Sequence, residues 1–171
     1  MPSRHHDIAD DLRHQIKTGS ISVTVRSTTV PASVHLTTLL KVPTGSPLAE
    51  YSCLSIEQGS PHGLARIYIP RDLVPAGVLD DDSACREAVT RFAVLGSSPA
   101  TVRETVCARS PTPDEASALR IGSTAVVLAI TRVATDSTGR VIEAALLAFP
   151  GNRVDAVFTA HHVLDERQTQ G

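Results

Sequence analysis

The side chains that could bind a metal ion are gathered at three places in the 171-residue sequence. Two pairs of adjacent histidines, His5–His6 and His161–His162, carry imidazole nitrogens, and the triplet Asp80–Asp82 carries carboxylates. Adjacent residues of a strand point to opposite faces, and neither histidine pair has a carboxylate at a metal-binding spacing. Acidic residues just before a helix are explained by the positive end of the helix dipole. We therefore expect solvated side chains at all three places, with no metal and no cofactor.

Residues for covalent or acid–base catalysis are equally sparse. The sequence contains neither a G-x-S-x-G motif nor a serine, histidine and aspartate at triad spacing. Glu104 and Glu143 could face one cavity, but no evident base accompanies them. The three cysteines, Cys53, Cys85 and Cys107, lack the spacing of zinc ligands and are odd in number, which predicts reduced and mostly buried thiols. The sequence therefore does not indicate an enzyme.

Composition excludes other classes of protein. A chain of this length with 42% hydrophobic residues can bury one core, with room for an appendage. We expect a cytoplasmic location without membrane contact, because no apolar run approaches the roughly 20 residues of a membrane span and the N-terminal stretch lacks an apolar signal segment. Scattered Lys and Arg, a net charge of −2 and few aromatic residues argue against a broad nucleic-acid-binding face.

The elements that must position these residues occur in two similar series. In Pro31–Pro70, a helix that we expect to begin at Pro31 precedes two strands joined by the turn "EQGSP". In Thr112–Pro150, a helix with a capping box at Thr112 precedes strands Ala125–Val133 and Arg140–Phe149. A single hairpin is marginal in water, so we expect both hairpins to join one sheet. The predicted fold class is α+β, a pseudo-symmetric antiparallel sheet with helices packed on it.

Two more segments complete the expected elements. Ile8, Leu12 and Ile16 have the spacing of an amphipathic helix within residues 1–20, and its apolar stripe must pack against the sheet or another subunit. Between the two series, we expect a helix over Ala84–Leu95, followed by a strand in "ATVRETVCARS".

Several stretches carry a resemblance to a known family. The N-terminal "HHDIADDLRHQIKTGSIS" resembles the opening helix of GntR-family transcriptional regulators. The stretches "LLKVPTGSPL", "GLARIYIP", "VRETVCARSPTPDEASALRIG" and "VLAITRVATDSTGRVIEAALLAFPGNR" resemble the UTRA effector-binding domain of the HutC-type branch. The resemblance implies a chorismate-lyase-like fold that senses a small-molecule effector. It places a remnant of a winged helix-turn-helix at residues 1–20 and a UTRA-like domain at residues 21–171.

The sequence departs from the family after its first helix. Family members continue into a helix-turn-helix and a wing, whereas "KTGSISVTVRST" runs directly into a strand of the effector domain. Without a recognition helix, nothing enters the major groove of DNA. We therefore expect a regulator that lacks a complete DNA-binding domain and binds DNA only weakly, whereas the remaining helix packs or dimerises.

The resemblance also implies the ligand-contacting residues. Phosphosugar-sensing members carry arginines where this sequence has Cys53 and Ser55, and neither can replace the bidentate clamp that arginine offers to phosphate. Ser83 matches a serine that helps to bind the anionic group, and Glu143 matches a carboxylate that contacts polar groups of the ligand. Phe149 stands where a ligand-contacting tyrosine is common. We expect a cavity lined by these five residues that holds a neutral or cationic ligand. The alternatives are a solvated strand end for Glu143 and a core aromatic for Phe149.

Three functions remain open at this point. The first is a ligand-sensing and dimerisation domain that pairs as a homodimer or with a full-length regulator. The second is an enzyme on the chorismate-lyase-like fold, and the third is a dimerisation module without a ligand.

Overall fold

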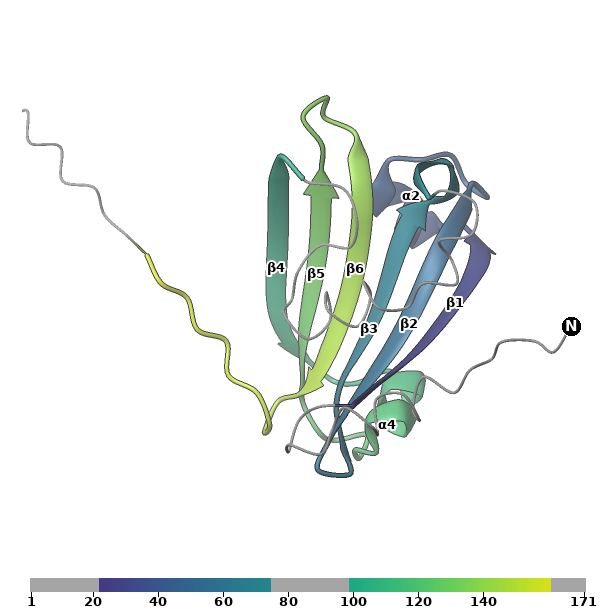
Figure 1. Cartoon of the computed structure of the whole chain (residues 1–171). Helices are drawn as coiled ribbons and strands as arrows, with labels where there is room; N and C mark the ends of the chain where they lie inside the picture. Colours follow the sequence, from purple (N-terminus) through teal and green to yellow (C-terminus); the bar gives the residue numbers. More distant parts are fainter. Residues whose placement is uncertain (1–21, 75–98, 161–171) are drawn as a thin grey trace, which may run out of the picture.

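The computed structural model describes residues 22–74 and 99–160, which form six strands, two α-helices and one 3-10 turn (Figure 1). The strands lie in one antiparallel sheet in the order β1-β2-β3-β6-β5-β4. The elements in chain order are β1 (Ser22–Pro31), α2 (Val34–Leu40), β2 (Pro47–Glu57), β3 (Ser60–Pro70), η1 (Arg71–Leu73), β4 (Thr101–Arg109), α4 (Pro113–Leu119), β5 (Val127–Thr135) and β6 (Val141–Pro150).

One structural unit occurs twice in this sheet. Each half consists of a strand, a helix and a hairpin, first β1-α2-β2-β3 and then β4-α4-β5-β6, and β3 pairs with β6 where the halves meet. The prediction of one antiparallel sheet is therefore confirmed. The predicted helix start at Pro31 is wrong, because Pro31 pairs with Pro47 as the last residue of β1, and α2 begins only after the N-cap Ser33.

Local signals at the ends of α4 explain why this helix was predicted within a few residues. The Oγ1 of Thr112 accepts a hydrogen bond from the backbone N–H of Glu115 at 3.2 Å, and the Glu115 carboxylate accepts one from the Thr112 N–H at 2.9 Å. This capping box satisfies two backbone donors that the first helical turn leaves open. Arg109 of β4 adds a bidentate ion pair to Glu115 at 2.7 and 2.8 Å.

The hairpin turns follow from residues that tolerate a left-handed backbone. Gln58 and Gly59 join β2 to β3 with φ values of 49° and 77°, the arrangement that suits the right-handed twist of paired strands. In the turn between β5 and β6, Gly139 has a φ of 86°, and the Asp136 carboxylate accepts hydrogen bonds from the N–H groups of Thr138 and Arg140. The Thr138 hydroxyl also donates to this carboxylate. Together these bonds hold the pKa of Asp136 below its usual range, and the bond from the Thr138 hydroxyl has the largest effect.

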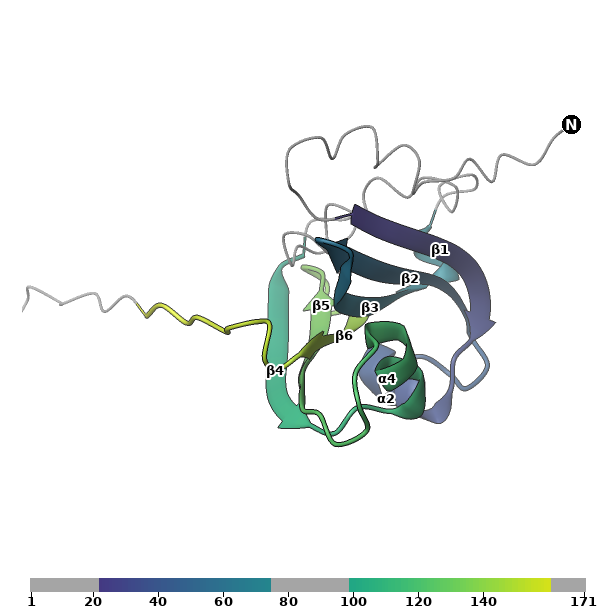
Figure 2. The same ribbon diagram turned by 90° about the horizontal axis from the view of Figure 1, so that it is seen from below.

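Both helices cover the same face of the sheet, as Figure 2 shows. From α2, Leu36 and Leu40 are buried against Leu48, Tyr68 and Ala144. From α4, Leu119 is buried against residues of β3, β5 and β6. Fully burying one leucine stabilises a fold by about 1.5–3 kcal/mol, so these side chains fix the helices to the sheet.

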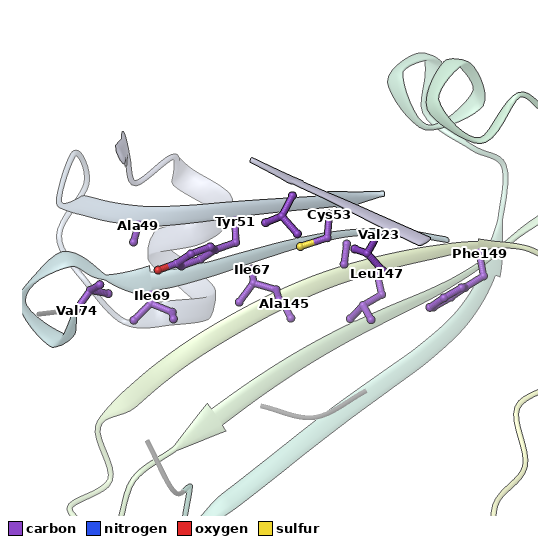
Figure 3. Packing of buried hydrophobic residues seen from close by; sticks show 12 residues of the cluster. Val23, Ala49, Tyr51, Cys53, Ile67, Ile69, Val74, Ala145, Leu147 and Phe149 are labelled. Atoms are coloured by element: carbon purple, nitrogen blue, oxygen red, sulfur yellow. The ribbon is translucent and has the colours of Figure 1, made fainter. Parts of the chain in front are cut away.

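The opposite side, which we call the open face, is covered by neither described helix. Antiparallel partners point to the same side, and the registers therefore assign Tyr51, Cys53, Ile67, Leu147 and Phe149 to this face. These residues form one apolar cluster with two valines of β1 (Figure 3). The edge strand β4 is almost wholly exposed, and Cys107 on it is exposed too, so the expectation of a buried thiol is right for Cys53 and wrong for Cys107.

Several predictions concern residues outside those that the structure describes. They are the N-terminal helix within residues 1–20, the helix over Ala84–Leu95, the triplet Asp80–Asp82 and both histidine pairs. In the described ranges, no helix has the length and apolar character needed to cross a membrane.

Candidate functional site

Four of the five expected ligand-contacting residues lie on the open face. Cys53 and Ser55 belong to β2, and Glu143 and Phe149 belong to β6 on the other side of β3. Ser55 faces Gly63, and Cys53 faces Ala65, which in turn faces Leu147. The fifth residue, Ser83, lies outside the described residues.

Phe149 packs over the backbone of Gly63. A Cβ atom at Gly63 would lie 2.5 Å from Cε1 of Phe149, closer than two carbons can approach, so only glycine lets the ring settle here. The Ser55 hydroxyl donates a hydrogen bond to the Gly63 carbonyl at 3.1 Å, and His62 meets the ring edge-on at 6.1 Å between ring centroids. Ser55, Gly63 and Phe149 therefore form one compact group beside Cys53.

Glu143 lies apart from this group. It lies six positions before Phe149 along β6, which corresponds to roughly 20 Å of extended strand. Glu143 is 1% exposed and therefore not the solvated strand end that the sequence left open. The structure thus brings Cys53, Ser55 and Phe149 together and places Glu143 near the other end of the open face.

An ion pair between β4 and β5 adds charge to this face. The Nε of Arg132 donates to Oε1 of Glu104 at 2.8 Å, and the Arg132 side chain is only 2% exposed. Glu104 faces Arg132, Arg132 faces Ala145, and Ala134 faces Glu143, so Glu143 is a diagonal neighbour of Arg132 on the same side. Sequence reasoning paired Glu104 with Glu143 but missed Arg132, although a lone arginine inside the apolar stretch "VLAITRVAT" was a visible signal.

A groove of about 190 Å³ opens beside Phe149. Its floor consists of β4 and β5 residues, and its outer wall is the chain that follows β6. The lining side chains are apolar except for two acidic ones, Glu104 and Asp155. Val157 and Phe158 of the outer wall are 85% and 79% exposed, so the groove has apolar surface available for a ligand.

The turn after β6, "PGNRVD", holds the outer wall in place. Arg153 donates from Nη1 to the carbonyl of Pro61 at 2.6 Å and so ties this turn to the β2–β3 hairpin. The Gly151 N–H donates to the Val126 carbonyl at 2.8 Å, and a Cβ at Gly151 would lie 2.9 Å from that same oxygen. Glycine and arginine at these positions therefore fix where the chain leaves the sheet.

The described residues contain no group of three or more histidine, cysteine, aspartate or glutamate side chains that could hold a metal ion. Tyr68, on the helix-covered face, has its pKa raised to about 12, first by burial and then by the nearby charge of Glu50. It is therefore a neutral phenol near neutral pH and not an acid–base group.

Comparison with known proteins identifies the family of the domain that carries this site. Residues 19–155 match the family model of the UTRA domain. An uncharacterized HTH-type transcriptional regulator of Rhizobium meliloti is 31% identical over 126 residues, 73% of this chain and 51% of that protein. This chain therefore spans about half the length of that curated relative.

Two solved structures share the fold. The effector domain of PhnF from Mycobacterium smegmatis aligns with a TM-score of 0.67 at 19% identity, over 90% of this chain and 94% of that one. A GntR-family transcriptional regulator from Bacillus cereus aligns with a TM-score of 0.70 at 17% identity, over 82% of this chain and 99% of that one. The Rhizobium and Bacillus proteins are both named as transcriptional regulators.

Proposed function

This chain belongs to the UTRA domain family of GntR-type, HutC-type transcriptional regulators, and on that premise we propose that it senses a small-molecule effector on its open face and dimerises. One observation carries the proposal. Cys53, Ser55 and Phe149, expected from the sequence to contact a ligand, meet on one side of the sheet next to a groove. Both described helices pack on the other side of the sheet, and the groove has exposed apolar surface at Val157 and Phe158.

The effector that suits this face is neutral or cationic. A phosphate group would need charged donors, and the positions of the two clamp arginines hold Cys53 and Ser55. Cys53 is fully buried, and the Ser55 hydroxyl bonds to a backbone carbonyl. Glu104 and Glu143 place two carboxylates on the face against the single guanidinium of Arg132. An anion would therefore meet repulsion where a neutral or positive molecule does not.

Assembly and location form the second part of the proposal. We infer a homodimer, or a heterodimer with a full-length regulator, because β4 is an edge strand of the described sheet and is exposed along its length. Weak, sequence-independent DNA binding by this chain follows from the direct run of "KTGSISVTVRST" into β1. A cytoplasmic location fits a regulator that acts where DNA is.

A thermal-shift screen of the whole chain against metabolites tests the sensing role. Binding to the folded state alone raises stability by about 2.7 kcal/mol at a hundred times Kd, which for a chain of this size raises Tm by about 5–10 °C. A turnover assay on each stabilising compound separates a sensor from an enzyme, since a sensor leaves the compound unchanged. A chain that dimerises but is stabilised by no metabolite would instead be a dimerisation module.

A further inference from the structure

The groove beside Phe149 has apolar walls of a kind that bind hydrocarbon groups. Val106, Leu128 and Ile130 form the floor next to the Phe149 ring, and Val157 and Phe158 stand on the outer wall. At about 190 Å³ the groove is smaller than most ligand pockets, so it fits a ring or short chain and not a large molecule.

Every charged side chain that lines the groove is acidic. Glu104 belongs to β4 and pairs with Arg132 of β5, whereas Asp155 lies on the outer wall. Across the described strands of the open face, Glu104, Arg132 and Glu143 are the charged side chains, with a formal sum of −1. Asp155 makes that sum −2, so the local charge complements a cation.

Arg132 holds the Glu104 carboxylate in place. The Arg132 side chain is only 2% exposed and its Nε binds one oxygen of Glu104, whereas the Glu104 side chain keeps 42% of its surface exposed. An ionised carboxylate has about four acceptor positions, so one bond to Arg132 leaves capacity for a second donor. Glu104 is thus a fixed acceptor at the end of an apolar groove, and Arg132 is the residue that positions it.

We propose that this groove binds a small apolar ammonium compound, with its hydrocarbon part against Phe149 and its ammonium group on Glu104. The inference rests on the proposed sensing function and deepens it by naming the ligand class and a contact that the family resemblance did not supply. Charge-assisted hydrogen bonds are roughly twice as strong as neutral ones, so the contact with Glu104 sets the preference for a cation.

Titration of the whole chain with three compounds of matched shape tests the proposal. We would follow backbone amide NMR signals with 2-phenylethylammonium, neutral 2-phenylethanol and anionic 3-phenylpropanoate. The ammonium compound is expected to shift signals of β4 and β5 with a Kd of about 1 mM or lower, at least about tenfold below the Kd of the carboxylate. No saturable binding up to about 10 mM, or equal binding of the carboxylate, would overturn the proposal.

Matched variants locate the charge that matters. Glu104→Gln keeps the shape and should raise the Kd of 2-phenylethylammonium about tenfold, with little effect on 2-phenylethanol. Glu57→Gln, an exposed carboxylate on the β2–β3 hairpin outside the groove, should change neither. If Glu104→Gln unfolds the chain because Arg132 loses its charged partner, Asp155→Asn takes its place, with an expected weakening of a few-fold.

The outcome also distinguishes this proposal from the sensing function. An unchanged Kd in the folded Glu104→Gln chain, or in Asp155→Asn where that variant replaces it, rejects the groove as the ammonium site. The metabolite screen on the same chain decides the sensing function separately, because it reports stabilisation by any compound at any part of the open face.

Discussion

At the scale of single residues, Gly63 determines how closely Phe149 packs over β3. Gly63→Ala would place a methyl group 2.5 Å from the ring, and the ring has few places to go because Phe149 is 3% exposed. We predict a loss of about 1–3 kcal/mol in the free energy of unfolding, as for other overpacked cores. Urea denaturation would measure it.

Gly122→Ala is the matched control for this substitution. No atom lies within 4 Å of a Cβ built at Gly122, so its replacement should change the free energy of unfolding by less than about 0.5 kcal/mol. Equal stabilities of the two variants would show that Phe149 does not pack against Gly63 in solution.

Some residues of the candidate site could be predicted from the sequence and others could not, for physical reasons. Phe149 and Cys53 were predicted because the family resemblance identifies their positions as ligand-contacting. Side chains alternate between the two faces of a strand, and this alternation places both residues on the open face. Arg132 was missed because its ion-pair partner Glu104 lies 28 residues earlier, on another strand. The distance of Glu143 from Phe149 was available from the sequence, because both residues lie in the predicted strand Arg140–Phe149 and six positions of extended strand span roughly 20 Å.

At the scale of elements, the two helix caps differ in strength. Thr112 takes part in a reciprocal capping box, whereas Ser33 accepts a single, longer bond of 3.4 Å from the Leu36 N–H. Thr112→Ala should therefore cost about 1 kcal/mol of stability and Ser33→Ala less. Chemical denaturation of both variants would compare them, and a larger loss for Ser33→Ala would contradict the structure.

The ion pair between Glu115 of α4 and Arg109 makes the stability of the fold depend on pH in the acid range. The Arg109 side-chain bonds hold the pKa of Glu115 below its ordinary value of 4.5 in the folded chain. A carboxyl group whose pKa is lower when folded stabilises the fold above its unfolded pKa, and this stabilisation is lost as pH falls through the folded pKa. Between pH 7 and about pH 3, the wild-type chain should therefore lose more stability than Glu115→Gln. Parallel slopes of stability against pH for the two chains would refute this assignment.

Elements were predictable from the sequence to the extent that their signals are local. The capping box, the turn "EQGSP" and the apolar runs of β5 and β6 specify α4 and both hairpins within a few residues. The start of α2 was misplaced because Pro31 suits either the first turn of a helix or the end of an edge strand. The pairing of β3 with β6 could be expected only from the repeat, because it joins residues some 80 positions apart.

At the scale of the whole molecule, β4 is the exposed edge strand through which we predict assembly. Its residues are almost all exposed, and Val102 is exposed on the open face. We predict a dimer mass by light scattering at micromolar concentration. Val102→Lys or Val102→Arg should weaken the dimer if the two chains meet along β4, because charged edge strands disfavour pairing. A monomer mass for the unmodified chain would contradict the dimer.

A DNA-binding measurement tests the expectation that this chain has no recognition helix. We predict weak binding that falls steeply with salt and does not discriminate between sequences, as expected for contacts to phosphates alone. Fluorescence anisotropy with a palindromic and a scrambled duplex would measure it. Tight, sequence-selective binding to the palindrome would show that a base-reading element exists in the chain.

Calorimetry with glucosamine and glucosamine 6-phosphate at physiological salt tests whether the chain senses neutral or cationic molecules. We predict that the phosphate group brings no gain in affinity, because two missing arginine contacts correspond to a loss of roughly a hundredfold or more. Glu143→Gln should improve binding of the phosphorylated sugar by removing a negative charge from the face. Preference of the unmodified chain for glucosamine 6-phosphate, unaltered by Glu143→Gln, would show instead that the chain is a phosphosugar sensor.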